Sequence, residues 1–320
     1  MTLSLIQRMA ADDNIDAAYH WLCRRRRRYH HNDDVWWLRH DWPRHKARLQ
    51  QQWRDGAYRL GPLQIRRCED GDHLWWDAAD ALTLRALSQT LGAAWRPRAS
   101  PHCTHLAGHG GVVGALRRVR AALSEYEYVF RTDVRGYYAN IDHTLLLPML
   151  ADAFPDPLVL RLLYDYVSCT LCDGGLFHSM RRGICRGGSL SPLIGALYLD
   201  SLDQAMTQRD VFYVRYMDDW VVLCRSHGQL RRAVARVNSI LNGLTLRQHP
   251  DKTFIGRISR GFDFLGWQFH PDGCRPTASS LHRRDQRIAR LYEQGASDGR
   301  VGAYLRRWEM GKRTTTPRTL

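Results

Sequence analysis

The sequence has no long hydrophobic run, fewer acidic than basic residues, and cysteines without a regular spacing. No stretch approaches the ~18 uninterrupted apolar residues that a membrane-spanning helix needs, and the first residues lack the layout of a signal peptide. The eight cysteines are scattered rather than arranged in a framework, so we expect reduced thiols that act mostly as packing residues. These absences argue against a membrane protein or a disulfide-bonded secreted protein, and they predict a cytoplasmic one.

Positive charge is in clear excess. Lys and Arg number 47 against 32 Asp and Glu, a formal net charge of +15, which favours a polyanionic partner. The 11 Trp and 14 Tyr side chains offer stacking surfaces for bases, so nucleic acid is the expected partner and a membrane surface the weaker alternative. A run of five arginines at residues 24–28, followed by Tyr29, His30 and His31, fits either a solvated face or a contact with a phosphate backbone.

Residues 212–223 carry a pair of acids between two runs of β-forming residues. This pattern predicts two strands joined by a tight turn at Asp218 and Asp219. Asp favours turns, so an acidic hairpin turn would explain the pair by itself. However, a short apolar run is normally buried, and burying carboxylates without partners is costly. A second β-run at residues 128–134 also ends in an acid, Asp133.

Three carboxylates on neighbouring strands have a known chemical use. They can hold two divalent metal ions about 3.5–4 Å apart, an arrangement that stabilises the attacking and leaving oxygens in phosphoryl transfer. Hard oxygen ligands suit Mg²⁺.

At this point the sequence resembles a family. Tyr216-Met217-Asp218-Asp219 between hydrophobic strands, with Asp133 and Tyr138 five residues apart upstream, resembles the palm of reverse transcriptases. The resemblance implies an α+β fold of the right-hand polymerase type, in which an antiparallel palm sheet is backed by helices. It implies helical fingers at residues 1–124, a palm at 125–272 with a fingers-side insertion around 145–185, and a short helical thumb at 273–320.

The same resemblance implies roles for individual residues. Asp133, Asp218, Asp219 and the Val134 carbonyl would hold two Mg²⁺ ions, with Mn²⁺ as a substitute. Lys252 would be the general acid, and the Tyr138 ring would exclude a ribose 2′-hydroxyl. Contacts with the nucleotide are expected for Arg66, Arg67, Arg85, Arg186 and Gly187. Contacts with primer or template are expected for Tyr216, Met217, Ser191, Pro192, Leu265, Gly266 and Trp267.

The motif around Arg186 departs from the family. Residues 183–192 resemble the family's Gln-Gly-x-x-x-Ser-Pro, but Arg186 stands where Gln is usual, which predicts a phosphate contact in place of the amide hydrogen bond. Ser191 is expected to cap a helix that continues through Leu202. Tyr137 is expected to point away from Tyr138 if the segment is extended.

Local patterns predict further elements. We expect mainly helix over residues 1–60, strands at 58–63 and 74–76 with a turn at 69–72, helices at 80–91 and 230–244, and a thumb helix capped by Ser279 or Ser280 and ending at Gly295.

The predicted function is an RNA-directed DNA polymerase that extends a DNA or RNA primer with dNTPs on an RNA template. The motifs favour a free-standing, group II intron-like bacterial enzyme, and the length suggests no room for RNase H, endonuclease or integrase domains. As a hypothesis, it copies a dedicated non-coding RNA in antiphage defence, and an accessory protein is left open. Two alternatives remain: an RNA-binding or splicing-helper protein with a vestigial polymerase site, and an RNA-synthesising polymerase of the same fold.

Overall fold

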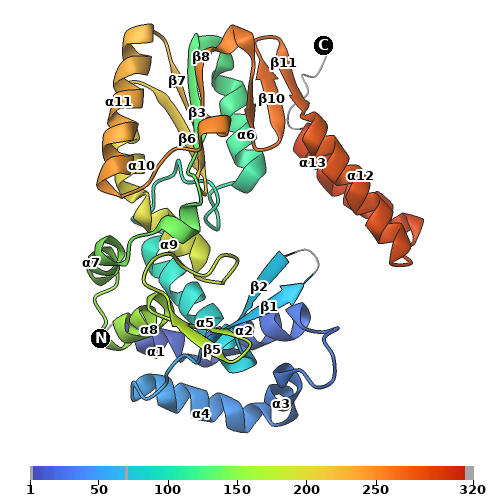
Figure 1. Cartoon of the computed structure of the whole chain (residues 1–320). Helices are drawn as coiled ribbons and strands as arrows, with labels where there is room; N and C mark the ends of the chain where they lie inside the picture. Colours follow the sequence, from blue (N-terminus) through green and yellow to red (C-terminus); the bar gives the residue numbers. More distant parts are fainter. Residues whose placement is uncertain (1–2, 69–70, 314–320) are drawn as a thin grey trace. The chain divides into compact units, whose positions relative to one another are not determined.

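A computed structural model describes residues 3–68 and 71–313 of the chain. The chain divides into two compact units, each assembled from separate segments. The first unit comprises Met1–Ala99, Gly136–Leu199 and Leu244–Leu246, and the second comprises Ser100–Arg135, Asp200–Gly243 and Arg247–Leu320. Figure 1 shows their elements.

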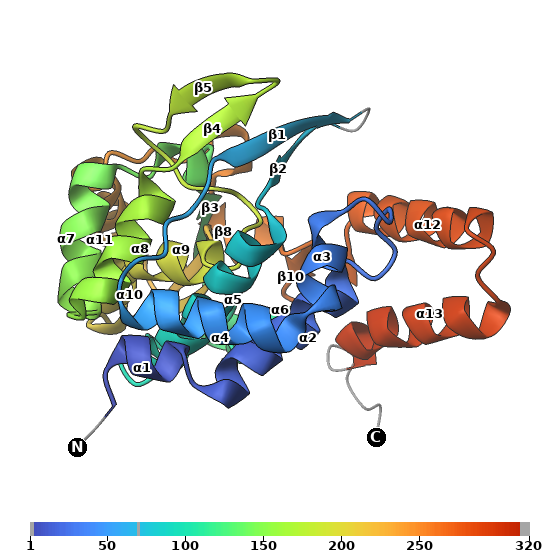
Figure 2. The same cartoon turned by 90° about the horizontal axis from the view of Figure 1, so that it is seen from below.

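Helices surround one small mixed sheet in the first unit. The strands lie in the order β2-β1-β4-β5, with β1 parallel to β4 and the other neighbours antiparallel, and Figure 2 shows them side by side. The strands are β1 Leu63–Cys68, β2 Gly71–Trp75, β4 Thr170–Asp173 and β5 Leu176–Ser179. The helices are α1 Leu5–Met9, α2 Asp12–Arg25, α3 Asp34–His40, α4 Trp42–Arg54, α5 Ala78–Trp95, α7 His143–Ala153, α8 Pro157–Val167 and α9 Ser191–Tyr198, with a 3₁₀ turn η2 at Tyr137–Asn140.

The second unit is built on an antiparallel sheet with the order β6-β7-β3-β8. A smaller antiparallel sheet, β11-β10-β9, follows it in the chain. The strands are β3 Tyr128–Asp133, β6 Phe212–Tyr216, β7 Asp219–Cys224, β8 Phe254–Arg257, β9 Phe262–Phe264, β10 Trp267–His270 and β11 Gly273–Pro276. The helices are α6 Gly111–Ala122, α10 Asp200–Thr207, α11 His227–Gly243, α12 Ala278–Glu293 and α13 Asp298–Arg313, with 3₁₀ turns η1 Leu123–Glu125, η3 Pro250–Lys252 and η4 Ile258–Arg260.

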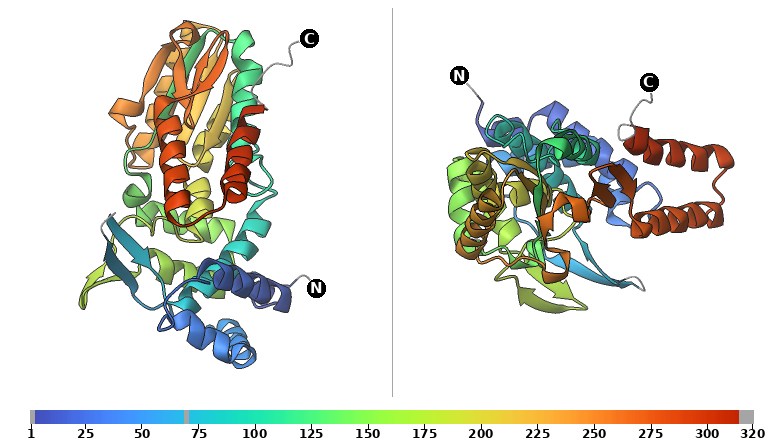
Figure 3. Two further views of the ribbon diagram at one scale, coloured as in Figure 1. Left: turned by 90° about the vertical axis from the view of Figure 1, so that its right-hand side faces the viewer. Right: turned by 90° about the horizontal axis from the view of Figure 1, so that it is seen from above.

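Helices cover the four-stranded sheet of the second unit on both faces. α11 packs against β3 and β7, and α6 packs against β6, on opposite sides of the sheet in Figure 1. The apolar core on the α6 side also includes buried residues of β9 and β10, such as Phe264 and Phe269. The near-continuous burial of β7 follows from this two-sided cover. Helices α12 and α13 lie side by side beyond β11 (Figure 3).

Most of the predicted elements are present, although both strands expected in this region had wrong boundaries. The strand expected at 74–76 is β2 Gly71–Trp75, which includes two residues of the turn expected at 69–72. The strand expected at 58–63 begins only at Leu63, because the Tyr58 hydroxyl and the Gly61 amide both donate to the buried Asp80 carboxylate, at 2.7 and 2.9 Å, and Pro62 has no amide proton to give to a sheet. Burial raises the pKa of Asp80 to about 6. Part of the expected turn, Glu69 and Asp70, lies outside the described residues.

Two helix starts were also predicted wrongly. Thr277, not Ser279 or Ser280, caps α12: its hydroxyl accepts from the Ser280 amide. Ser191 is the first residue of α9 and makes no cap. Its hydroxyl instead donates to the carbonyls of Cys185 and Gly188, at 2.7 and 2.9 Å. The helix expected through Leu202 ends at Tyr198, and α10 begins at Asp200.

Candidate active site

Two of the three predicted metal-binding acids face each other at the ends of neighbouring strands of the second unit. Asp133 ends β3 and Asp219 begins β7, and the antiparallel register pairs them directly. Directly opposed residues of an antiparallel pair have Cβ atoms about 4.5–5.5 Å apart. The turn between β6 and β7 consists of Met217 and Asp218, one residue earlier than the turn expected at Asp218 and Asp219, because Asp219 already pairs with Tyr216 in the ladder. The sheet therefore collects all three acids at one end of the β6-β7-β3 strands.

Two basic side chains partly neutralise these acids. The Lys252 Nζ donates to Asp133 Oδ2 at 2.6 Å, and the Arg131 Nε lies 3.6 Å from Asp219 Oδ1. Burial raises the pKa of Asp219 to about 7, and the negative charges of Asp133 and Asp218 act in the same direction while Arg131 opposes them. Asp219 therefore stays protonated up to a higher pH than an exposed carboxyl group does.

The donor atoms fit a hard divalent cation. Asp133 Oδ1 and Asp219 Oδ1 are buried and accept no hydrogen bond within the described part of the chain, and such orphaned oxygens are costly without a ligand. The same described residues contain no ready arrangement of three or more His, Cys, Asp or Glu side chains around one point. The opposed pair still offers the hard oxygen ligands that suit a divalent cation, and Lys252 and Arg131 supply positive charge beside them.

Val134 continues the chain beyond β3 beside Gln248. The two residues form an isolated antiparallel β-bridge, whose hydrogen bonds use the carbonyl of Asp133 and the amide of Arg135. The Val134 carbonyl takes no part in these hydrogen bonds. Its role as a ligand stays a prediction, as does that of Lys252 as general acid.

Sequence reasoning missed three residues near the acids. Arg131 precedes Asp133 by two positions, so the two-residue period of a strand could have placed both side chains on one face. Arg215, fully buried on β6, pairs with Asp203 of α10. His105 precedes α6 by a loop and accepts a hydrogen bond from the Met217 amide. Arg215 lies only two positions before Met217, whereas no local pattern links His105 to the acidic turn.

The predicted primer-contacting turn is present in the second unit. Leu265 and Gly266 join β9 to β10 with positive φ values of 47° and 81°, as a two-residue type I′ turn requires. The Gly266 carbonyl accepts from the amide and hydroxyl of Thr277, at 3.0 and 3.2 Å. The turn is thereby tied to the start of α12. Its contact with a primer stays a prediction, as does that of Trp267.

Tyr137 and Tyr138 belong to the first unit, and the expectation that they point opposite ways was wrong. Their segment is a 3₁₀ turn rather than an extended strand, and the two rings lie 5.2 Å apart between centroids. Both rings pack beside Gly195 of α9, where an added Cβ would lie within 3.1–3.3 Å of them. Tyr137 is buried and donates from its hydroxyl to the Gly195 carbonyl at 2.6 Å, whereas Tyr138 is only partly buried.

The loop before α9 leaves Arg186 and Gly187 exposed. Their neighbours are fixed, since Ser191 holds the carbonyls of Cys185 and Gly188 and the Ser88 hydroxyl donates to the Ser189 carbonyl at 2.7 Å. The Arg186 side chain is thus presented from a rigid base, and its contact with nucleotide phosphate remains a prediction.

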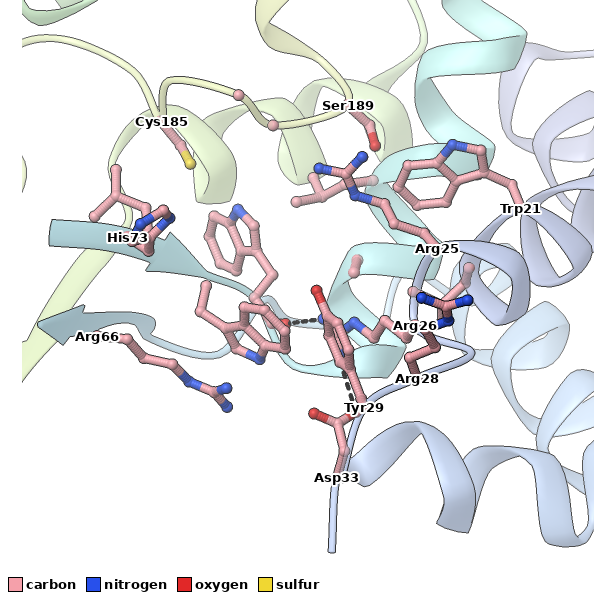
Figure 4. A pocket seen from close by; sticks show the side chains of 18 of the residues that line it. Trp21, Arg25, Arg26, Arg28, Tyr29, Asp33, Arg66, His73, Cys185 and Ser189 are labelled. Atoms are coloured by element: carbon pink, nitrogen blue, oxygen red, sulfur yellow. Dashed lines mark hydrogen bonds and ion pairs between the residues drawn. The ribbon is translucent and has the colours of Figure 1, made fainter. Parts of the chain in front are cut away.

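A pocket of about 620 Å³ lies in the first unit between this loop, the end of α2 and the β1–β2 hairpin. Figure 4 shows its charged and aromatic lining. Arg26 is structural, because it is buried against Asp34 and the Trp76 carbonyl. The other lining arginines, Arg25, Arg28 and Arg66, have no carboxylate within ion-pair distance in the described ranges.

The three arginines predicted to bind triphosphate differ in their surroundings. The Arg66 guanidinium is exposed and stacks 3.9 Å from the centre of the Trp75 ring. Arg67 forms an ion pair with Asp173 at 2.6 Å. Arg85 is half-buried 5.1 Å from the Trp21 ring, and burial lowers its pKa. Arg66 is therefore the one whose charge borders the pocket.

Comparison with solved structures identifies the class of fold. Telomerase from Candida albicans in complex with a TWJ fragment of telomeric RNA superposes with a TM-score of 0.53 at 12% identity, over 71% of this chain and 47% of that chain. Apo telomerase from Candida tropicalis gives the same score and identity, over 71% and 50%. At this identity the likeness concerns the fold alone: an α+β right-hand polymerase fold with an antiparallel sheet backed by helices.

Comparison of sequences identifies the family. A sequence model of the family described as reverse transcriptase (RNA-dependent DNA polymerase) matches residues 82–269, and the chain belongs to this family. It is 25% identical to protein YkfC of Escherichia coli (strain K12), over 55% of this chain and 54% of that protein. It is 23% identical to the group II intron-encoded protein LtrA of Lactococcus lactis subsp. cremoris, over 41% and 21%. The chain thus spans about half the length of YkfC and about a fifth of that of LtrA.

Proposed function

We propose that the protein is an RNA-directed DNA polymerase that extends a primer with dNTPs. The observation that carries this proposal is the opposed pair Asp133 and Asp219 at the strand ends of the antiparallel sheet, each with a buried oxygen that accepts no hydrogen bond within the described residues. Family membership supports the choice of reaction.

The acids would bind the metal ions of the reaction. Asp133, Asp218 and Asp219, with the Val134 carbonyl, would hold two Mg²⁺ ions, or Mn²⁺ in their place, which neutralise the phosphate charge and stabilise the attacking and leaving oxygens. Lys252 holds Asp133 through its ammonium group, and the same group can supply a proton to a leaving pyrophosphate. Tyr138 would limit the sugar to deoxyribose.

Substitution of Asp218 and Asp219 tests this function. The wild-type protein should extend a primer on an RNA template with dNTPs and Mg²⁺, and Asp218→Asn combined with Asp219→Asn should abolish extension while RNA binding and a cooperative thermal unfolding transition are kept. The two changes remove metal-binding charge and leave the shape of the hairpin. A folded wild-type protein that incorporates no dNTP on primed RNA, with either Mg²⁺ or Mn²⁺, would overturn the proposal.

We further propose that single-stranded RNA binds at the pocket of the first unit. Arg25, Arg28 and Arg66 place three uncompensated positive charges around Trp21 and Trp75, a combination suited to phosphates and stacked bases. Within the described residues no helix is both long and apolar enough to cross a bilayer, and we propose a cytoplasmic protein.

The biological role is a separate proposal. LtrA is encoded by a group II intron, and one telomerase structure contains telomeric RNA. By analogy, this chain would copy a dedicated non-coding RNA, with antiphage defence as the proposed setting and an accessory protein as a further partner. Sequencing the nucleic acid that copurifies with the protein tests the template, and a heterogeneous mixture of cellular RNAs would contradict it.

A further inference from the structure

The turn that presents Asp218 and Asp219 has an unfavourable backbone. Tyr216 pairs with Asp219 in the β6–β7 ladder, so Met217 and Asp218 form a two-residue turn. Met217 has a φ of 57°, while φ at Asp218 is not positive. A two-residue turn with positive φ at its first central position normally has Gly there. A methionine at this position needs support from its surroundings.

Both peptide groups that flank Met217 are held by side chains. The Met217 amide donates to His105 Nδ1 at 2.9 Å, and the Met217 carbonyl accepts from Arg215 Nη1 at 2.8 Å. One bond fixes the peptide plane before Met217 and the other fixes the plane after it. Together they determine φ and ψ of the strained residue, and hence the direction in which the turn presents Asp218.

The arginine is itself immobilised. Arg215 is fully buried and donates from Nε to Asp203 Oδ1 at 2.7 Å, and its Nη2 bonds to Asp203 Oδ2. The Tyr213 hydroxyl donates to the same carboxylate at 2.8 Å. A buried charge held at this many points has one geometry, because any other would leave it uncompensated.

The histidine is fixed by the backbone that precedes it. The Arg215 amide donates to the His102 carbonyl at 2.9 Å, and the Thr104 amide donates to the Arg215 carbonyl at 2.8 Å. Residues 102–104 therefore run beside β6 as a short added strand. His105 leaves this ladder next to the turn, with its ring edge-on to Tyr216 at 5.9 Å. Because Nδ1 accepts a hydrogen bond from the Met217 amide, the neutral imidazole ring carries its proton on Nε2.

We propose that His105 is a positioning residue for the catalytic turn: its Nδ1 holds Met217 in the left-handed conformation that presents Asp218, beside Asp219 of β7, to the metal ions. This inference rests on the proposed function, because it assigns His105 a role in the same metal site. It also predicts that an acceptor is needed at the δ1 position, whereas the imidazole ring as such is not.

A matched pair of variants separates the acceptor from the ring. His105→Leu removes the acceptor, and His105→Asn keeps an oxygen the same number of bonds from the backbone. We expect His105→Leu to weaken Mn²⁺ binding by about ten-fold, as measured by electron paramagnetic resonance without nucleic acid. Single-turnover incorporation should slow by a similar factor, while the dNTP KM should change less than about two-fold. His105→Asn should stay within about three-fold of wild type in both measurements.

A double-mutant cycle tests the link to Met217. Gly adopts positive φ without strain, so in a Met217→Gly background the loss of His105 should matter much less for Mn²⁺ affinity. The inference would be overturned by equal Mn²⁺ affinity in wild type and His105→Leu, or by equal losses of Mn²⁺ affinity in folded His105→Leu and His105→Asn. A fully additive cycle would overturn it as well. So would a wild-type protein that binds no Mn²⁺.

The readouts also distinguish this inference from the proposed function. If the wild-type protein binds Mn²⁺ and His105→Leu weakens that binding, while neither extends a primer, the positioning role stands and the polymerase assignment fails.

Discussion

At the scale of single residues, the acids of the second unit carry a cost when no metal is bound. Asp219 is partly buried, its Oδ1 accepts no hydrogen bond within the described residues, and burial raises its pKa from 3.8 to about 7. The folded state therefore keeps a proton that the unfolded chain has released between about pH 4 and pH 7. Stability should fall as the pH rises through this window and should level off above it.

Asp219→Asn should remove this penalty. In the presence of a chelator we expect the variant to melt about 2 °C or more above wild type at pH 8, with a difference that shrinks toward pH 5, because wild-type Asp219 is then protonated as well. Thermal melts at the two pH values measure this. Asp251→Asn, which changes an exposed carboxylate, serves as the control and should shift neither melt. A variant that melts no higher than wild type at pH 8 contradicts the assignment.

Tyr138 is the residue proposed to choose between the two sugars. Its ring is packed beside Gly195, so it cannot easily turn aside to accommodate a 2′-hydroxyl. Tyr138→Ala should raise rNTP use relative to dNTP use by about ten-fold or more, since a clash of ~1.4 kcal/mol corresponds to that factor. Incorporation of matched rNTP and dNTP on one primed template measures the ratio.

The neighbouring tyrosine provides the control for that measurement. Tyr137→Phe removes the hydroxyl that donates to the Gly195 carbonyl and should cost about 1 kcal/mol of stability, without changing the sugar preference. Unchanged discrimination in Tyr138→Ala would remove the gate and reopen the choice between DNA and RNA synthesis.

At the scale of elements, the sequence predicted what depends on short-range pattern. Runs of β-forming residues located β3, β6 and β7, and two of the acids at their ends, Asp133 and Asp219, fell on opposed positions of one ladder. The boundaries failed where distant residues compete for backbone groups. Asp80 takes the amide of Gly61 away from a strand, and Ser191 bonds to the preceding loop instead of capping its helix.

The direction of side chains was predicted less well than the position of elements. Tyr137 and Tyr138 would point apart in a strand, but a 3₁₀ turn brings both against α9. His105 could not be connected to the turn from sequence, because 112 residues separate it from Met217 and only the folded sheet brings the two together. The grouping of the three acids was thus predictable, whereas the long-range contact of His105 with their turn was not.

At the scale of the whole molecule, the predicted site residues divide between the two units. The acids, Lys252 and the β9–β10 turn belong to the second unit, and Tyr138, Arg186 and the basic pocket belong to the first. Each unit is built from segments that alternate along the chain. Because of this alternation, the continuous domains predicted from the sequence, such as 1–124 and 125–272, differ from the units of the structure. The assignments of fingers, palm and thumb stay predictions.

The net charge of the molecule does not by itself say where RNA binds, and salt dependence can separate local from general attraction. Each phosphate neutralised on a single strand contributes about −0.7 to the slope of log K against log salt. Arg25→Ala with Arg28→Ala removes two uncompensated charges from the pocket, so the slope for a single-stranded RNA oligonucleotide should become shallower by about 1.4. Fluorescence anisotropy over a salt series measures this slope.

Arg231→Ala with Arg232→Ala removes the same charge from the exposed face of α11 and should leave the slope nearly unchanged. Equal reductions in both pairs would mean that the oligonucleotide responds to overall charge, and the pocket would then lose its role as the strand-binding site.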